Sequence, residues 1–330
     1  MLNPDLHLNQ KLFDKDVEQK ATRDGFGEAL VELGESNPNV VVLTADLSES
    51  TRTDGFEAKF PQRFFEVGVA EQNMAAIAAG LGLSGKIPFI SSYATFSPGK
   101  NWETIRTTII YGNSNVKIAG HHSGIMTGPD GATHQATEDI AITRAWPNIS
   151  VFVPCDAIEA KKATLKSAEI RGPVYLRFTR DKTPIITTKD TPFSKEVEVY
   201  WINEAPKTVI FATGYMLYYA LLAAKNLEEK GIKVQVANVS TIKPIDSKTI
   251  IKLAKEAGKV VTVEDHQVAG GLGGTIAEVL AKHYPTPMEF IGLQDTFAES
   301  GAPFELIKKY GMDEVAIEQA VTRLIGNQNE

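Results

Sequence analysis

Short apolar runs alternate with amphipathic helical patterns along almost the whole chain. Residues 40–45, VVVLTA, are typical of a strand that is buried on both faces of a parallel sheet. Strands that alternate with helices in this way favour a mostly parallel sheet with helices on both faces. The fold class that we expect is therefore α/β.

The alternation occurs in two series. In the first series, we predict strands at 40–45, 87–91, 116–120, 150–154 and 174–177, and helices at 22–34, 70–81, 101–110, 138–144 and 157–170. In the second series, we predict strands at 208–212, 234–238, 260–264 and 288–291, and helices at 216–230, 246–257, 275–282 and 313–324. Two α/β domains in tandem follow from this pattern.

Between the two series the pattern lapses into a stretch rich in Thr, Pro and Lys. A chain of 330 residues is long enough for two domains that each have a core. We therefore expect a polar N-terminal arm over residues 1–20, a first domain over 21–185, a linker over 186–206 and a second domain over 207–330.

Composition limits the kind of protein that this chain can be. A net charge of −7 argues against a nucleic acid partner, because phosphate binding needs a basic face. No apolar run approaches the roughly 20 residues that span a bilayer, and the start MLNPDLHLNQ has no signal-peptide core, so we expect a cytoplasmic protein without a membrane contact. The single cysteine, Cys155, excludes an internal disulfide and is expected to be a core thiol.

The stretch FFEVGVAEQNMAAIAAGLGLSG, residues 64–85, places Glu71 in the first turn of a predicted helix. The helix dipole favours a carboxylate there, so an ordinary first-turn glutamate is one interpretation. The small residues before it, Gly68 to Ala70, and the Ala- and Gly-rich helix behind it would also let a flat group pack closely. In that setting Glu71 could share a proton with a ring nitrogen.

Polar residues that follow apolar strands are the candidates for a site, because ligands of open α/β sheets bind beyond the carboxyl ends of the strands. The richest such loop is HHSGIMTGPDGATHQ, which holds His121, His122 and His134 together with Asp130. Imidazole can transfer protons near neutral pH. A metal site and a purely structural loop are the alternatives, but the spacing matches no metal-binding motif.

The segments GVAEQNMAAIAAGLGLSG and GPDGATHQATEDIA resemble those of thiamine-diphosphate enzymes of the transketolase type. The resemblance extends over nearly the whole chain, including the tail ESGAPFELIKKYGMD, and corresponds to the C-terminal half of a transketolase. It implies a thiamine-diphosphate-binding fold, here the pyrimidine-binding domain, followed by a transketolase C-terminal-like domain.

The resemblance implies three catalytic residues. Glu71 matches the glutamate that bonds a nitrogen of the aminopyrimidine ring of the cofactor. His134 and His122 match histidines that bind the substrate and transfer its protons, and Asp130 matches an aspartate that binds a sugar hydroxyl.

The resemblance also implies a phosphate site. Arg23, Ser50 and Arg180 match positions that hold the phosphate of a sugar phosphate, and guanidinium groups suit phosphate oxygens geometrically. Taken singly, each of the two arginines is better interpreted as part of a surface salt bridge. Asp46 matches an aspartate near the cofactor.

Aromatic residues that stack on the aminopyrimidine are harder to assign. Phe96 is the best match, and Tyr93 and Trp102 are weaker ones, while plain core aromatics are the alternative. The sequence departs from the family pattern at residues 97–101, so which aromatics stack and which sugars bind stay open.

The chain has no Gly-Asp-Gly segment of the kind that holds the diphosphate through a metal in this family. We therefore expect a second polypeptide, the N-terminal transketolase subunit, to bind Mg²⁺ or Ca²⁺ and the diphosphate. No metal ligand is expected from this chain. By analogy, an α2β2 heterotetramer with sites between the chains would result.

We expect the chain to be the C-terminal subunit of a split transketolase. This enzyme would transfer a two-carbon ketol unit from a ketose phosphate to an aldose phosphate, in carbohydrate metabolism of the pentose phosphate pathway type. Alternatives are the beta subunit of a 2-oxo acid dehydrogenase, a deoxyxylulose phosphate synthase-like enzyme, and a non-catalytic regulatory subunit. A dinucleotide-dependent oxidoreductase is disfavoured, because Ile276 stands where the G-x-G-x-x-G fingerprint after Gly271 and Gly273 needs glycine. His266, just before this turn, is expected to be structural or to lie at a subunit contact.

Overall fold

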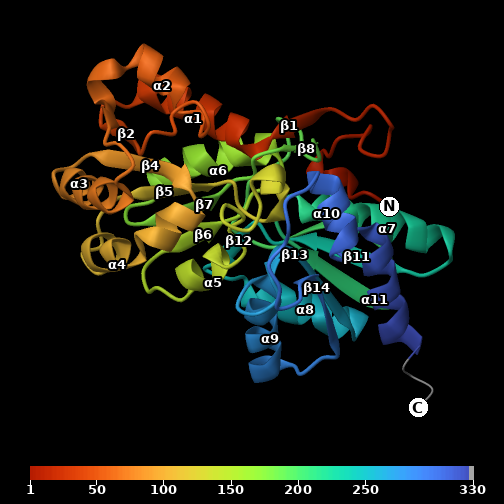
Figure 1. The fold of residues 1–330 in the computed structure, drawn as a ribbon. Helices are drawn as coiled ribbons and strands as arrows, with labels where there is room; N and C mark the ends of the chain where they lie inside the picture. Colours follow the sequence, from red (N-terminus) through yellow and green to blue (C-terminus); the bar gives the residue numbers. More distant parts are fainter. Residues whose placement is uncertain (327–330) are drawn as a thin grey trace.

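The computed structural model describes residues 1–326 and contains two mainly parallel sheets that are flanked by helices (Figure 1). This arrangement confirms the predicted α/β class. The first sheet has seven strands, in the spatial order β12 (Thr241–Lys243), β6 (Ser150–Phe152), β7 (Val174–Arg177), β5 (Lys117–His121), β4 (Ile87–Tyr93), β2 (Val40–Thr44) and β3 (Phe64–Glu66). The central strands β2, β5 and β7 are buried throughout. Strand β2 is a near-continuous apolar run in the sequence, as expected for a strand buried on both faces, whereas β5 begins with Lys117 and ends with His121.

The helices of the first domain are α1 (Thr22–Ser36), α2 (Asp54–Lys59), α3 (Glu71–Leu83), α4 (Trp102–Thr104), α5 (Asp139–Arg144) and α6 (Ala157–Glu169). Helices α1 and α6 pack very closely, since a Cβ added to Gly25 of α1 would lie 1.9 Å from the carbonyl oxygen of Ala157. Two segments of wider, π-helical winding, Thr95–Lys100 and Ile105–Ile110, flank α4, where a single regular helix over 101–110 was expected. Pro98 interrupts the first of them.

The second sheet has five strands, in the order β14 (Met288–Leu293), β13 (Val260–Gln267), β10 (Thr208–Ala212), β11 (Val234–Asn238) and β9 (Glu198–Trp201), and only β9 is antiparallel. Its helices are α7 (Met216–Glu229), α8 (Ser247–Ala257), α9 (Leu272–His283), α10 (Pro303–Lys309) and α11 (Glu314–Gly326). The last four residues of the predicted second domain, 327–330, lie outside the described residues.

Two segments that the sequence pattern marks as an arm and a linker take part in the folded core. The arm contributes Leu6, Leu8 and Leu12 to the core of the second domain. The stretch predicted as a linker contains strand β9, which is too short to show a clear alternation. A small ladder of β1 (Gln19–Ala21) with β8 (Lys182–Pro184) also joins the two ends of the first domain.

Strand β12 belongs to the second half of the chain but pairs with β6 of the first sheet. Thr241 lies opposite Phe152, and the amide N–H of Val153 donates to the carbonyl oxygen of Ser240 at 2.7 Å. The two domains therefore share a sheet, and three residues of irregular hydropathy give no sequence signal for this pairing.

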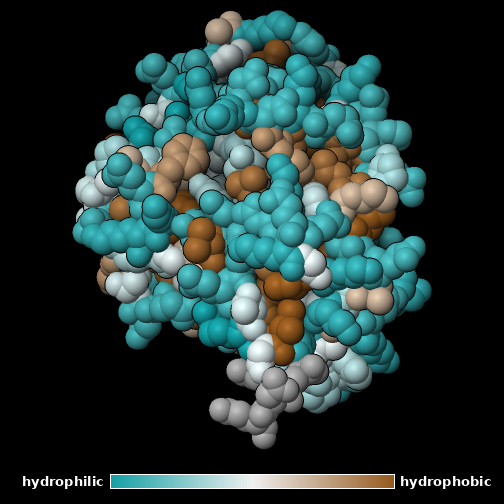
Figure 2. Space-filling model, turned by 90° about the vertical axis from the view of Figure 1, so that its right-hand side faces the viewer, coloured by the Kyte–Doolittle hydropathy of each residue, from teal (hydrophilic) through white to brown (hydrophobic). Residues whose placement is uncertain are grey.

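One face of the molecule is mostly hydrophilic. Figure 2 shows the side on which the N-terminus, α7 and α11 lie, and most side chains there are hydrophilic, with hydrophobic ones in separate places. Within residues 1–326, no helix combines the length and hydrophobicity that a membrane crossing requires.

A buried acidic cluster connects α6 to the second sheet. Asp156 caps α6 and also accepts the amide N–H of Thr187 at 2.6 Å. Glu159 accepts the amide N–H of Cys155 at 2.6 Å and the side-chain N–H of Asn238 at 3.0 Å. Cys155 is buried, as predicted for a core thiol. Burial raises the pKa of Glu159 to about 7, against the opposing effect of the Cys155 amide.

We predict that Glu159 makes stability fall as pH rises from 5 to 8. The folded state binds this proton up to about pH 7, whereas the unfolded chain releases it near pH 4.5, so protonation favours the folded state between these values. In E159Q the amide can pair with Asn238, whose Oδ1 atom is buried and has no partner. The unfolding free energy of the wild type minus that of E159Q should fall by up to roughly 3 kcal/mol over this range. Urea titrations at both pH values measure this difference, and a constant difference would contradict the prediction.

Candidate functional site

The candidate site lies where β4 and β5 end, at Tyr93 and His121. The segment Thr95–Lys100 follows β4, and a loop of residues 121–136, here called the histidine loop, follows β5. Helix α3 contacts the segment after β4. Three segments that are far apart in sequence thus meet at the carboxyl edge of the first sheet, as expected for a ligand site of this fold.

Glu71 begins α3, and its side chain is only 2% exposed. Its carboxylate accepts a hydrogen bond from Lys100 Nζ at 2.8 Å, and its backbone carbonyl accepts one from Asn101 Nδ2 at 3.0 Å. Lys100 was not among the predicted site residues. The Pro-Gly break just before it is the only sequence signal that this lysine turns back toward α3.

Two histidines and two aromatic residues form a cluster at the segment that carries Lys100, the partner of Glu71. The Tyr93 ring stacks on His122 with ring centroids 3.8 Å apart, and Phe96 meets His134 edge-on at 5.4 Å. Tyr93 and Phe96 also stack on each other at 5.9 Å. Aromatic faces, imidazoles and a buried carboxylate are thus provided together, which suits a flat heterocycle with ring nitrogens.

A cluster of positive charge lies next to His122. Arg23 donates to the carbonyl oxygen of Ser50 at 2.7 Å, and Arg180 approaches that of Thr127 at 3.5 Å. Burial, followed by the charges of Arg23 and Arg180, lowers the pKa of His122 to about 3, so this imidazole is neutral. Arg52, which was not predicted, adds a further cation and pairs with Asp24 at 2.8 Å.

Unpaired polar atoms point to a missing anionic ligand near these cations. Arg23 Nε and His122 Nδ1 are buried and have no hydrogen-bond partner. Buried donors without partners are costly, and an anion with several acceptor oxygens would satisfy them. Arg23 and Arg180 therefore provide positive charge of the kind that binds an anion.

The remaining predicted residues lie at the margin of this cluster. Asp46 and Asp130 are exposed. Trp102 packs on Trp146 with ring centroids 5.8 Å apart, and among residues 1–326 no ring-to-ring contact joins it to Phe96 or Tyr93. His121 is buried instead, where its Nε2 atom lies 2.9 Å from Ser91 Oγ.

No metal-binding cluster accompanies the site. Among residues 1–326, no three His, Cys, Asp or Glu side chains converge in a way that could hold a metal ion. Within this part of the chain, no such cluster offers the oxygen ligands that a metal-bound diphosphate needs.

An exposed apolar face adjoins Glu71. Val69, just before α3, is 70% exposed, and Tyr111, after the helical segment that packs on α3, is 89% exposed. Other exposed large apolar side chains are Phe65 on β3, Ile77 and Leu83 on α3, and Trp102 on α4. Helices α3 and α4 lie side by side at the left of Figure 1. Large apolar side chains that are exposed in this way are candidates for a contact with another protein.

Comparison with known proteins gives two family matches. Residues 18–185 match the pyrimidine-binding domain of transketolase, and residues 198–317 match the transketolase C-terminal domain. The chain is 45% identical to a Methanocaldococcus jannaschii protein named "Putative transketolase C-terminal section", over 92% of this chain and 95% of that protein. It is 34% identical to the 6-deoxy-6-sulfo-D-fructose transketolase subunit SqwH of Clostridium sp. (strain MSTE9), over 98% and 99%. A solved structure described as "Split gene transketolase, inactive beta4 tetramer" matches with a TM-score of 0.85 and 46% identity, over 92% of this chain and 97% of that one.

Proposed function

The chain belongs to the transketolase family, in which it comprises the pyrimidine-binding and C-terminal domains, and from this premise we propose that it is the C-terminal subunit of a split transketolase. It would transfer a two-carbon ketol unit from a ketose phosphate to an aldose phosphate, together with a partner chain. Relatives that are named as a C-terminal section and as a transketolase subunit support this assignment.

The observation that carries the proposal is the buried carboxylate of Glu71 beside the cluster of Tyr93, Phe96, His122 and His134. Thiamine diphosphate, when bound, would supply the nucleophilic carbon that carries the ketol unit. Glu71 would hold a proton between its carboxylate and a nitrogen of the aminopyrimidine, and Phe96 and Tyr93 would face the ring. Lys100 would have to share Glu71 with that nitrogen, since both bind the same carboxylate.

The two histidines would act on the substrate. His122 is neutral, so it can donate a hydrogen bond from one ring nitrogen and accept one at the other. His134, whose Nδ1 atom lies 2.8 Å from Thr133 Oγ1, would transfer protons of the substrate hydroxyl. Arg23, Ser50 and Arg180 would hold the phosphate and so orient the sugar, while Asp130 would contact a hydroxyl at the exposed end.

The partner chain would supply what this chain lacks. The exposed apolar face around Val69 supports a contact with an N-terminal subunit that binds the diphosphate and Mg²⁺ or Ca²⁺. The solved relative described as an inactive β4 tetramer is consistent with a C-terminal chain that associates with itself but needs a partner for activity. An α2β2 assembly would place each site between chains.

Reconstitution tests the proposal. The chain should be copurified with its partner, loaded with thiamine diphosphate and Mg²⁺, and assayed with ketose phosphates and, separately, with pyruvate. Ketol transfer from a ketose phosphate is the expected result. Turnover of pyruvate alone would favour a 2-oxo acid dehydrogenase or a deoxyxylulose phosphate synthase, and full activity of the partner without this chain would favour a regulatory subunit.

We predict that V69D prevents assembly with the partner. An aspartate in the middle of an apolar contact would be desolvated without a counter-charge, so the affinity should fall at least about thirtyfold. Analytical ultracentrifugation of the mixed subunits measures the affinity between them. V315D is the matched control, because Val315 is also exposed but lies on α11 of the other domain. Equal weakening by both variants would contradict the assignment of the interface.

A further inference from the structure

Strand β13 of the C-terminal domain reaches the start of the histidine loop through Asp265. This carboxylate is 2% exposed and accepts the amide N–H of Ile125 at 2.9 Å and that of Met126 at 3.4 Å. It also accepts the Tyr215 hydroxyl at 2.7 Å. Gly124 allows this close approach, because a Cβ on Gly124 would lie 1.9 Å from Asp265 Oδ2.

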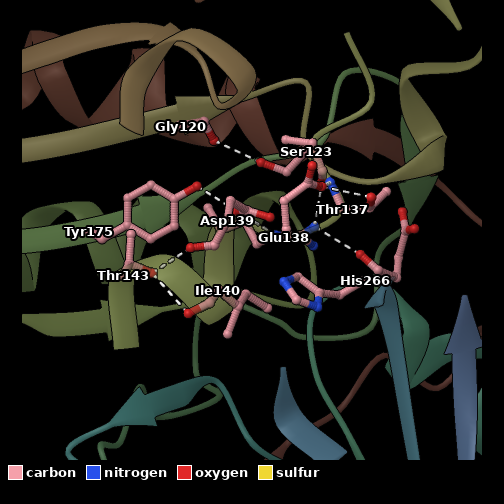
Figure 3. Close-up of polar contacts among 12 residues, drawn as sticks. Gly120, Ser123, Thr137, Glu138, Asp139, Ile140, Thr143, Tyr175 and His266 are labelled. Atoms are coloured by element: carbon pink, nitrogen blue, oxygen red, sulfur yellow. Dashed lines mark hydrogen bonds and ion pairs between the residues drawn. The ribbon is translucent and has the colours of Figure 1, made fainter. Parts of the chain in front are cut away.

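The end of the histidine loop is held by the next residues of the same strand. The amide N–H of Gln267 donates to the carbonyl oxygen of Thr137 at 2.8 Å. His266 Nε2 accepts the amide N–H of Ala141 at 3.3 Å, and burial lowers the pKa of His266, which keeps the imidazole available as an acceptor. Figure 3 shows His266 of β13 and Thr137, which lies just before α5.

The loop closes on itself between these two attachments. The amide N–H of Gly124 donates to the carbonyl oxygen of Ala136 at 2.7 Å, and Thr127 Oγ1 donates to that of His122 at 2.6 Å. His122 is thus three residues from the pair of amides that Asp265 binds. A shift of the backbone at Ile125 would therefore also move His122. It would move Thr127 as well, whose carbonyl oxygen lies 3.5 Å from Arg180.

From these contacts we infer that Asp265 is a positioning residue, which acts from the C-terminal domain on the substrate side of the site and not on the cofactor side. The inference rests on the proposed function for its kinetic part. Glu71 lies on α3 and is held by Lys100 and Asn101, so no contact of Asp265 reaches it directly. Through Asp265, the C-terminal domain would thus contribute to sugar phosphate binding by holding the histidine loop in position.

The first experiment measures the loop itself. In D265N, one carboxylate oxygen becomes an amide donor that faces other donors, so the amides of Ile125 and Met126 should exchange with solvent about tenfold faster. Amides of β10 serve as the internal reference, since a general loosening would change them equally. Y215F removes only the hydroxyl on Asp265 and should give a smaller change in the same direction, and it replaces D265N if that variant does not fold. Y200F is the control, because Tyr200 is equally buried in the same core but does not bind Asp265.

The second experiment uses the assembled enzyme loaded with thiamine diphosphate and Mg²⁺. In D265N, kcat/KM for the sugar phosphate should fall at least about tenfold, while the dissociation constant of thiamine diphosphate stays within about twofold. Unchanged exchange at Ile125 and Met126, or an equal loss of cofactor and substrate affinity, would overturn the inference. If wild-type enzyme shows no ketol transfer, the proposed function fails, whereas the exchange result still decides the role of Asp265 in the loop.

Discussion

An E71Q subunit, assembled with its wild-type partner, is expected to lose about a thousandfold in kcat, in the range of a missing acid–base group. Glutamine has nearly the shape of glutamate, so it can keep the contacts with Lys100 and Asn101. It cannot accept and return a proton at the ring nitrogen. Single-turnover assays of ketol transfer measure the loss, and calorimetry with thiamine diphosphate shows how much of it reflects weaker cofactor binding.

The matched control for E71Q is E103Q. Glu103 is an exposed glutamate on the neighbouring helix α4, so its replacement should leave kcat within about twofold. An E71Q enzyme that retains wild-type turnover would refute the role of Glu71 and, with it, the main support for the proposed function.

The R177M substitution is expected to lower the free energy of unfolding by about 3–5 kcal/mol, because it leaves a buried carboxylate without its counter-charge. Arg177 Nε donates to Asp139 Oδ2 at 2.8 Å, and both side chains are almost fully buried. Burial by itself would raise the pKa of the Asp139 carboxyl, but Arg177 and the Tyr175 hydroxyl hold it below its ordinary value. Figure 3 shows Asp139 and Tyr175 in this network. Urea unfolding at neutral pH measures the loss.

Two further variants separate charge from packing in this prediction. K166M breaks the exposed pair of Lys166 with Glu169 and should change stability by less than about 1 kcal/mol. The double variant D139L/R177M removes both buried charges and should recover part of the stability lost in R177M. A cost of R177M as small as that of K166M would show that Asp139 does not need its partner.

Sequence patterns predict the parts of this molecule that follow from local physical chemistry. Strands buried on both faces tend to be continuous apolar runs, so β2 and β10 are identifiable without a structure. Glu71 and His122 are visible as a first-turn carboxylate and a loop histidine, but the roles expected of them follow from the resemblance of their segments to those of transketolases. Whether these residues carry out the chemistry stays a prediction.

Contacts between segments distant in sequence are not predictable in the same way. Lys100 lies 29 residues from Glu71, and Asp265 lies 140 residues from Ile125. In the sequence, Lys100 is one polar residue in a broken turn, and Asp265 is one acidic residue at the end of a strand. Their partners depend on how the chain folds back, which hydropathy does not encode.

The pairing of β12 with β6 limits how this protein can change by recombination. Suppose that one domain were replaced by the corresponding domain of a distant relative. The edge strand β12 and its partner β6 would then come from different proteins. The backbone groups of Val151 and Phe152 would then be exposed to water or would pair with a strand that does not match them. We therefore expect the two domains to be exchanged only together, although each has its own sheet and its own helices.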